Sequence, residues 1–364
     1  MVPVFFVFFL GAGIAYANGA NDVSKGIATL VGSGSADYRR AIAWGTLWTG
    51  VGGLSGALLG KAMVATFGKG IFAAGVQPTL ATAIAILFGA MLWVGIATHK
   101  GLPVSTTHAI VGSIVGVAVL AFGPAGMNWA TLTHRVVLPL VLSPMIALLL
   151  TAATLRTLNA VVPATDCVCL EVSRPALASD ALLAPDMALV QVAACVSKEQ
   201  PNSRGITFNH LHWGTSAATS FSRGLNDAPK IVALVLGAML VAGTRPSKPL
   251  GAFVVVTAGM LAGGWLAGRK VTRVLGCKVT PMNHRESFIA NLITVALVAP
   301  GTALGLPMST THVASGAIIG ISSGEHKLNH SVVREMILAW VVTVPGAALL
   351  GAAVLVVLRA MGMK

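Results

Sequence analysis

Apolar stretches long enough to cross a membrane recur along this chain from one end to the other. A hydrocarbon core about 30 Å thick requires roughly 20 consecutive apolar residues from a helix. Only 10% of the residues are charged, whereas an ordinary soluble domain has about 25%. The sequence therefore predicts an all-α integral membrane protein, whose apolar runs cover residues 2–32, 40–60, 79–98, 104–122, 134–155, 206–243, 250–268, 286–304, 307–323 and 332–357.

The formal net charge of +13 does not indicate nucleic-acid binding, because the lysines and arginines lie mainly in short segments between the apolar runs. Such segments are typical of cytoplasmic loops. Segment 269–285 carries five basic residues and no acid, whereas the matching segment 61–78 carries two basic residues. This difference predicts opposite orientations for the two halves, with the amino terminus outside. The expected partner is a lipid bilayer, and no nucleic acid, metal or cofactor is expected.

Two motifs occur twice in the same order. Residues 19–22, Gly-Ala-Asn-Asp, return at 224–227 as Gly-Leu-Asn-Asp. Residues 101–108, Gly-Leu-Pro-Val-Ser-Thr-Thr-His, return at 305–312 with Met in place of Val. The separation between the two motifs is the same in both halves to within one residue, which indicates a duplicated unit.

The duplication divides the chain into three segments. We expect a first membrane repeat at 1–155, a polar cytoplasmic linker with four prolines at 156–205, and a second membrane repeat at 206–364. Both Asn-Asp motifs interrupt an apolar run, so each first helix is expected to be broken there. Inverted repeats with broken helices are a common construction of secondary transporters.

The repeated Ser-Thr-Thr segment indicates an anion site. Pro103 and Pro307 break the helix, so the residues that follow should begin the next helix. Free backbone N–H groups, hydroxyls and the positive end of the helix dipole converge at such a start. In a membrane, Ser and Thr also serve simply to cap helices or join them. Two symmetric copies favour substrate binding, by Ser105, Thr106, Thr107, Ser309, Thr310 and Thr311.

Acidic side chains inside apolar helices suggest ion or proton coupling. Asp22 and Asp227 each follow an Asn, and a buried carboxylate is costly unless it is paired, protonated or bound to a cation. Lys25 and Lys230 each lie three residues further on, within reach of the carboxylate on a helix. A single lysine could instead extend to the membrane interface. Its occurrence in both halves favours a functional role.

His108 and His312 end the two long motifs. An imidazole there could donate to the anion or carry a proton, because ionisable residues within a membrane are often functional. A histidine at a packed helix interface is also commonly structural. Both histidines are therefore candidates for proton coupling, together with the aspartates and lysines.

Taken together, the paired motifs resemble those of the inorganic phosphate transporter (PiT) family of secondary carriers. The resemblance implies phosphate uptake driven by sodium or protons, inverted repeats around a central site, and re-entrant half-helix hairpins. It also implies that Asn21 and Asn226 line the substrate and coupling-ion sites with the aspartates and the Ser-Thr-Thr residues. A homodimer is usual in that family.

The sequence departs from the family pattern at the cation ligands. Members commonly read Asn-Asp-Val-Ala-Asn, whereas Lys25 and Lys230 stand here in place of the last Asn. Many members also have a glutamate where Ala65 and Asn291 stand here. Two added ammonium groups disfavour a bound sodium ion. We therefore expect Lys25 and Lys230 to act as fixed cations in place of bound sodium. Transport would then be proton-coupled or uncoupled, and a sodium-coupled symporter is the alternative.

Other functions remain open from the sequence. Sulfate, another tetrahedral oxyanion, is a close alternative substrate because the same donors hold both anions. An anion channel would need a continuous pore with weak binding at several sites. An enzyme is not expected, because neither a Gly-x-Ser-x-Gly elbow nor a His-Glu-x-x-His pair is present. The leading interpretation is a secondary phosphate carrier of the plasma (inner) membrane.

Overall fold

The computed structural model describes residues 2–161, 168–169, 195–196, 207–244, 249–323 and 328–363. Its first half consists of the helices α1 (Val2–Asp22), α2 (Ser24–Gly32), α3 (Tyr38–Leu59), α4 (Lys61–Ala65), α5 (Leu80–His99), α6 (Thr106–Phe122), α7 (Trp129–Thr131) and α8 (Leu138–Val161). Its second half consists of α9 (Phe208–Val241), α10 (Leu250–Ala267), α11 (Arg269–Cys277), α12 (His284–Ala303), α13 (Thr310–Ile321) and α14 (His330–Ala360).

Three short helical turns and one pair of strands complete the described elements. Residues Thr66–Gly70 and Leu132–Val137 form π-helical turns, and Pro124–Gly126 form a 3-10 turn. The strands β1 (Val168–Cys169) and β2 (Cys195–Val196) pair antiparallel within the expected linker. Helix α8 continues to Val161, six residues beyond the expected end of the first repeat. Most of the linker at 156–205 lies outside the described residues, and its cytoplasmic side stays a prediction.

Each expected apolar run is a helix or a pair of helices in the structure. Six described helices are long and apolar enough to cross a membrane, and the pair α3 and α4, bent by 71°, adds a seventh. In contrast, α6 and α13 have 17 and 12 residues. At 1.5 Å per residue, both are shorter than a hydrocarbon core of about 30 Å. They form hairpins with α5 and α12, which agrees with re-entrant half-helices in a multi-pass membrane protein.

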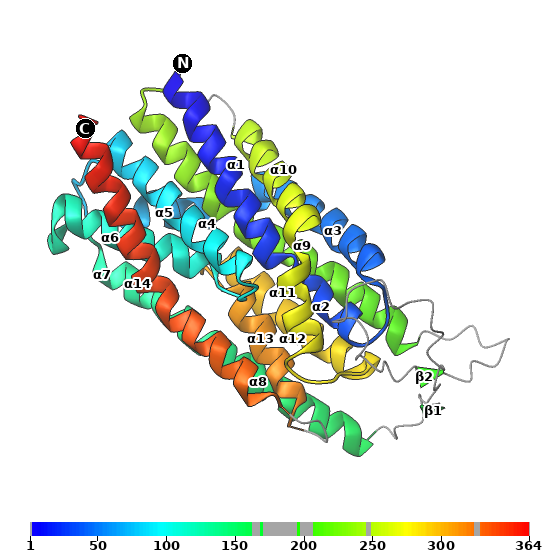
Figure 1. The fold of residues 1–364 in the computed structure, drawn as a ribbon. Helices are drawn as coiled ribbons and strands as arrows, with labels where there is room; N and C mark the ends of the chain where they lie inside the picture. Colours follow the sequence, from blue (N-terminus) through cyan, green and yellow to red (C-terminus); the bar gives the residue numbers. More distant parts are fainter. Residues whose placement is uncertain are drawn as a thin grey trace, which may run out of the picture.

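The two halves pack against each other reciprocally. Helix α1 lies along α10, and α3 lies along α9; in the same way α6 packs on α14, and α8 packs on α13. Helices α1 and α9 run in opposite directions, and both termini lie at one end of the molecule (Figure 1). The α5–α6 hairpin occupies that end, while the α12–α13 hairpin occupies the other (Figure 1). The orientation of the repeats in a membrane stays a prediction.

Glycines allow the central helices to touch. A methyl group on Gly19 of α1 would collide with the carbonyl oxygen of Met260 on α10. A methyl group on Gly224 of α9 would likewise collide with the carbonyl oxygen of Thr49 on α3. Both glycines lie within continuous helix. Their role is close backbone approach, as in other membrane helix pairs.

Only the first Asn-Asp motif lies at a helix break. Helix α1 ends at Asp22 and α2 begins at Ser24, with Val23 between them. Helix α9 instead continues through its Asn-Asp motif without interruption, which corrects the expected second break. Pro229 lies inside α9. Because proline has no backbone N–H, the helix is maintained there without the usual bond to the carbonyl four residues earlier.

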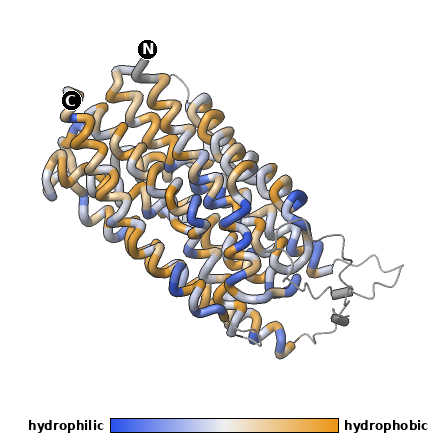
Figure 2. Tube along the Cα trace, viewed as in Figure 1, coloured by the Kyte–Doolittle hydropathy of each residue, from blue (hydrophilic) through white to orange (hydrophobic). Residues whose placement is uncertain are grey.

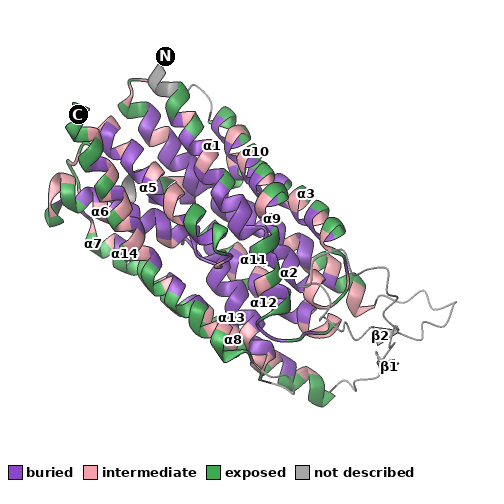
Figure 3. Cartoon of the chain, viewed as in Figure 1, coloured by how far each residue is buried: buried purple, intermediate pink, exposed green. Residues whose placement is uncertain are grey.

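Hydropathy and burial are distributed as lipid contact requires. Apolar segments dominate the end that carries the termini, and hydrophilic segments gather in the middle of the bundle and at the opposite end (Figure 2). The buried residues form the interior, while the outer faces of α8 and α14 are exposed (Figure 3). Exposed side chains on α8 include Val141 and Leu149, and those on α14 include Val341 and Leu349. Lipid is the solvent that suits such a surface.

Candidate functional site

Asn21 holds the tip of the first hairpin. Its amide nitrogen donates to the hydroxyl of Thr98 and to the carbonyl of Leu102, both at 2.9 Å. Its amide oxygen accepts from the backbone N–H of Val104 at 3.2 Å. These bonds join the end of α1 to both sides of the turn between α5 and α6. The position of the α6 start is therefore fixed by Asn21.

Asn226 likewise bonds to both sides of the turn at the tip of the second hairpin, but the direction of its bond to the threonine is reversed. Its amide nitrogen donates to the carbonyl of Met308 at 2.9 Å, and its amide oxygen accepts from Thr302 at 3.1 Å. The sequence analysis did not single out Thr98 or Thr302. Each stands three positions before the glycine of its Gly-Leu-Pro motif, so a longer self-comparison would have found both.

The two Ser-Thr-Thr segments begin α6 and α13, which confirms the predicted helix starts. Ser105 caps α6 by accepting from the backbone N–H of His108, and Ser309 caps α13 by accepting from that of His312, both at 3.2 Å. The hydroxyl of Ser309 donates to that of Ser105 at 2.9 Å. The positive ends of two helices therefore meet head to head, with Thr310 buried at the first position of α13.

The carboxylate of Asp22 joins both hairpins. It accepts from the Lys25 ammonium at 2.7 Å and from Asn18 at 2.8 Å. It also accepts from Thr106 of the first hairpin at 3.2 Å and from Thr311 of the second at 3.3 Å. One acidic side chain is thus hydrogen-bonded to the first turns of both α6 and α13.

The second ion pair also crosses between the repeats. The Lys230 ammonium lies 3.2 Å from the Asp227 carboxylate and donates to the Thr107 hydroxyl at 2.8 Å and to the Met308 carbonyl at 3.1 Å. The amide of Asn18 donates to Asp227 at 3.2 Å as well as to Asp22. Asn18 therefore links the two carboxylates. No feature of its sequence context signals that role.

The charged side chains of this cluster are enclosed. Asp22 and Asp227 are 2% and 4% exposed, and Lys25 and Lys230 are each 1% exposed. Each carboxylate has an ammonium as counter-ion, which offsets much of the cost of removing both charges from water. In the described part of the chain, no group of three or more His, Cys, Asp and Glu side chains could hold a metal ion.

The two motif histidines lie against each other. The rings of His108 and His312 stack with centroids 4.3 Å apart and planes inclined by 17°. Nδ1 of His312 lies 2.7 Å from the Ser309 hydroxyl, whereas Nδ1 of His108 has no partner among the described residues. The ring of Trp340 covers His312 at 4.1 Å. The structure therefore places one imidazole directly behind the serine contact.

Arg223 completes the cluster with a third cation. It lies on α9 one turn before Asn226 and is 1% exposed. The matching position in the first repeat is the neutral Asn18, so any role of Arg223 breaks the symmetry between the repeats. All three guanidinium nitrogens lack a hydrogen-bond partner within the described residues.

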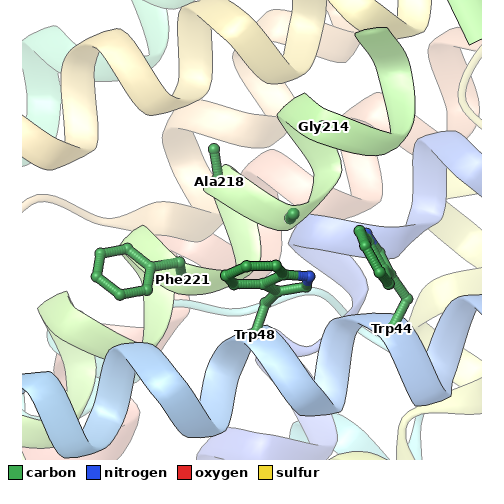
Figure 4. A pocket seen from close by; sticks show the side chains of 6 residues that line it. Trp44, Trp48, Gly214, Ala218 and Phe221 are labelled. Carbon is green, nitrogen blue, oxygen red and sulfur yellow. The ribbon is translucent and has the colours of Figure 1, made fainter. Parts of the chain in front are cut away.

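A separate apolar groove lies between α3 and α9. It has a volume of about 550 Å³ and is lined by Trp44, Trp48, Gly214, Ala217, Ala218 and Phe221. The indole rings of Trp44 and Trp48 and the ring of Phe221 line its wall (Figure 4). Because its lining is almost entirely apolar, this groove is no candidate for binding an anion.

Comparisons with known proteins find phosphate transporters among the relatives of this chain. A protein of Pyrococcus horikoshii named as a phosphate permease is 28% identical over 415 residues, covering 100% of both chains. A low-affinity inorganic phosphate transporter of Mycobacterium tuberculosis is 27% identical, covering 93% of this chain and 73% of that protein.

The fold is also similar to a solved structure. The sodium-dependent phosphate transporter matches with a TM-score of 0.81 and 29% sequence identity, over 99% of this chain and 100% of that one. The model of the phosphate transporter family matches residues 18–351, a range that includes both copies of each motif. The chain therefore belongs to the phosphate transporter family.

Proposed function

We propose that this protein carries inorganic phosphate across the plasma membrane as a secondary transporter. The observation that carries the proposal is the meeting of two helix N-termini at Ser105 and Ser309 inside a buried cluster of charges. Backbone N–H groups, hydroxyls and cations are the groups that hold oxyanions. Each of the two repeats contributes one hairpin to this meeting point. Such an arrangement suits alternating access around a fixed site.

Phosphate fits the cluster better than sulfate does. Phosphate near neutral pH carries a proton and can donate a hydrogen bond, whereas sulfate only accepts. The carboxylates of Asp22 and Asp227 are acceptors beside the helix starts. A protonated phosphate oxygen could donate to either of them, which sulfate cannot do.

The two lysines act as fixed surrogate cations in this proposal. Lys25 and Lys230 lie against the carboxylates that would otherwise attract a mobile cation. Their ammonium groups balance the carboxylate charge without a bound sodium ion. Transport is therefore independent of sodium and is proton-coupled or uncoupled.

The stacked histidines and the aspartates are the groups that we assign to the proton. His108 and His312 lie behind the serine contact. An imidazole can change its charge near neutral pH, and an intramembrane carboxylate can also carry a proton. A proton gradient would then bias the site between its two orientations.

The test is uptake of labelled phosphate by purified protein in liposomes, under a sodium gradient and separately under a proton gradient, with sulfate as competitor. Phosphate uptake without sodium, accelerated by the proton gradient, is the expected result. Sodium-dependent uptake would reject the role of the lysines but retain the carrier. Sulfate uptake without phosphate uptake would reject the substrate. Currents far above carrier turnover would indicate a channel instead.

A further inference from the structure

Arg223 has the least satisfied charged side chain in the buried cluster. The other four charged groups form two ion pairs, between Asp22 and Lys25 and between Asp227 and Lys230. The Arg223 guanidinium is 1% exposed, yet Nε and both terminal nitrogens have no partner among the described residues. A buried charge without a partner is rare in folded proteins because its desolvation is uncompensated.

The guanidinium belongs to the same electrostatic site. Arg223, Asp227 and Lys230 are spaced at i, i+4 and i+7 on the continuous helix α9, so they share one face. The Arg223 charge interacts with the carboxylates of Asp227 and Asp22 but forms no ion pair with either. Arg223 therefore lies on the α9 face that carries the second ion pair, within electrostatic range of both carboxylates.

The charge balance of the cluster calls for one anion. Each aspartate–lysine pair sums to zero, whichever of its two members holds the proton. Arginine stays protonated in proteins, so Arg223 leaves the five charged groups with one positive charge in excess. One singly charged oxyanion would neutralise the cluster. The planar guanidinium, with five donors, is the side chain best shaped to bind such an anion through two parallel bonds.

We propose that Arg223 binds the transported oxyanion directly, as a singly charged dihydrogen phosphate held between its guanidinium and the starts of α6 and α13. This proposal rests on the proposed function and names Arg223 as the principal side chain that binds the transported phosphate. The lysines are held by carboxylates and set the charge of the site, whereas the guanidinium is free to bind the substrate. The matching position, Asn18, is neutral, so the anion is held nearer to α9 than to α1.

Direct phosphate binding tests this proposal. Labelled phosphate is equilibrated with purified protein in detergent, comparing wild type with Arg223→Gln and Arg223→Lys. We expect Arg223→Gln to weaken phosphate binding about 100-fold or more, as for loss of one partner from a buried charge pair. Arg223→Lys keeps the charge but loses the planar guanidinium that can donate two parallel bonds, so we expect phosphate affinity to fall about tenfold. Arg334→Gln, an equal charge change at an exposed position of α14, should bind like wild type.

Thermal unfolding separates binding from a structural role. Without phosphate, Arg223→Gln should melt at or above the wild-type temperature, because the substitution removes an unpaired buried charge. Added phosphate should raise the melting temperature of wild type but not that of Arg223→Gln. A variant that melts lower than wild type, with an unchanged phosphate affinity in its folded fraction, would overturn the proposal and make Arg223 structural.

The proposed function and the role of Arg223 can fail separately. If wild type binds and transports phosphate and Arg223→Gln has the same affinity, the carrier stands and the arginine is not a ligand. If wild type binds sulfate but no phosphate, the proposed substrate is wrong, and the dihydrogen phosphate ligand falls with it. If phosphate affinity falls in the order wild type, Arg223→Lys, Arg223→Gln, both proposals are supported.

Discussion

The two copies of the Asn-Asp motif share one scaffold but differ one helical turn before the Asn. In the first copy that position is Asn18, whose amide links Asp22 and Asp227. In the second copy it is Arg223, whose guanidinium has no partner in the described chain. The first helix also breaks at Val23, whereas α9 continues. Duplication therefore provides both repeats with matching hairpins and ion pairs. At the one position where the repeats differ in this way, Asn18 binds the two carboxylates, whereas in our proposal Arg223 binds the anion.

The largest expected difference between the copies concerns the two aspartates. Asp22 accepts from Thr106 and Thr311, one on each hairpin, whereas Asp227 accepts no hydroxyl bond from either. Removing one member of a buried ion pair costs about 3–5 kcal/mol. We expect Asp22→Asn to lower initial phosphate uptake in liposomes by more than about 100-fold. Asp227→Asn should retain several times more activity, and equal losses would mean that the two copies are equivalent.

The lysines give the second comparison. Among the described residues, Lys25 bonds only within its own repeat, to Asn21 and Asp22, whereas Lys230 also donates to Thr107 of the other repeat. Replacing either by Asn leaves a carboxylate without its counter-ion. Uptake without sodium should fall about 100-fold in Lys25→Asn, with partial recovery when sodium is added. Uptake that requires sodium in wild type and persists in Lys25→Asn would contradict the surrogate-cation role.

Replacing Asn18 tests the link between the carboxylates. Asn18→Ala removes donors to both Asp22 and Asp227. Hydrogen bonds to charged groups contribute about 1.5–3 kcal/mol, so a loss of about tenfold or more in uptake rate is expected. Phosphate affinity should change less than in Arg223→Gln, because Asn18 contacts carboxylates and is not placed as an anion ligand. An equal loss of affinity in the two variants would remove the distinction between these positions.

The sequence predicts most of the fold and most of the residues that we place in the candidate site. Apolar run length places the helices, because lipid requires long uninterrupted segments, and self-comparison finds the matched motifs. It does not reveal that α9 stays continuous at Asn226, because a helix with Pro229 inside it is maintained by packing against α3 and α12. The sequence also does not reveal that Asn18 and Arg223 lie in the same site and have different roles there. Their roles depend on contacts between helices that are distant in the sequence.

Substitutions at the two hairpin tips are expected to have the smallest effects, and effects of similar size in the two repeats. Thr98 and Thr302 meet Asn21 and Asn226 through single hydroxyl bonds of 2.9 Å and 3.1 Å. Valine keeps the shape of threonine and removes that bond, which contributes about 1 kcal/mol. Thr98→Val and Thr302→Val should each lower the melting temperature by about 1–2 °C and reduce uptake only a few-fold. Each tip is held by one Asn–Thr bond, although Asn21 donates to Thr98 whereas Thr302 donates to Asn226. Effects that differ tenfold would therefore show that this difference in direction makes the two hairpins unequal.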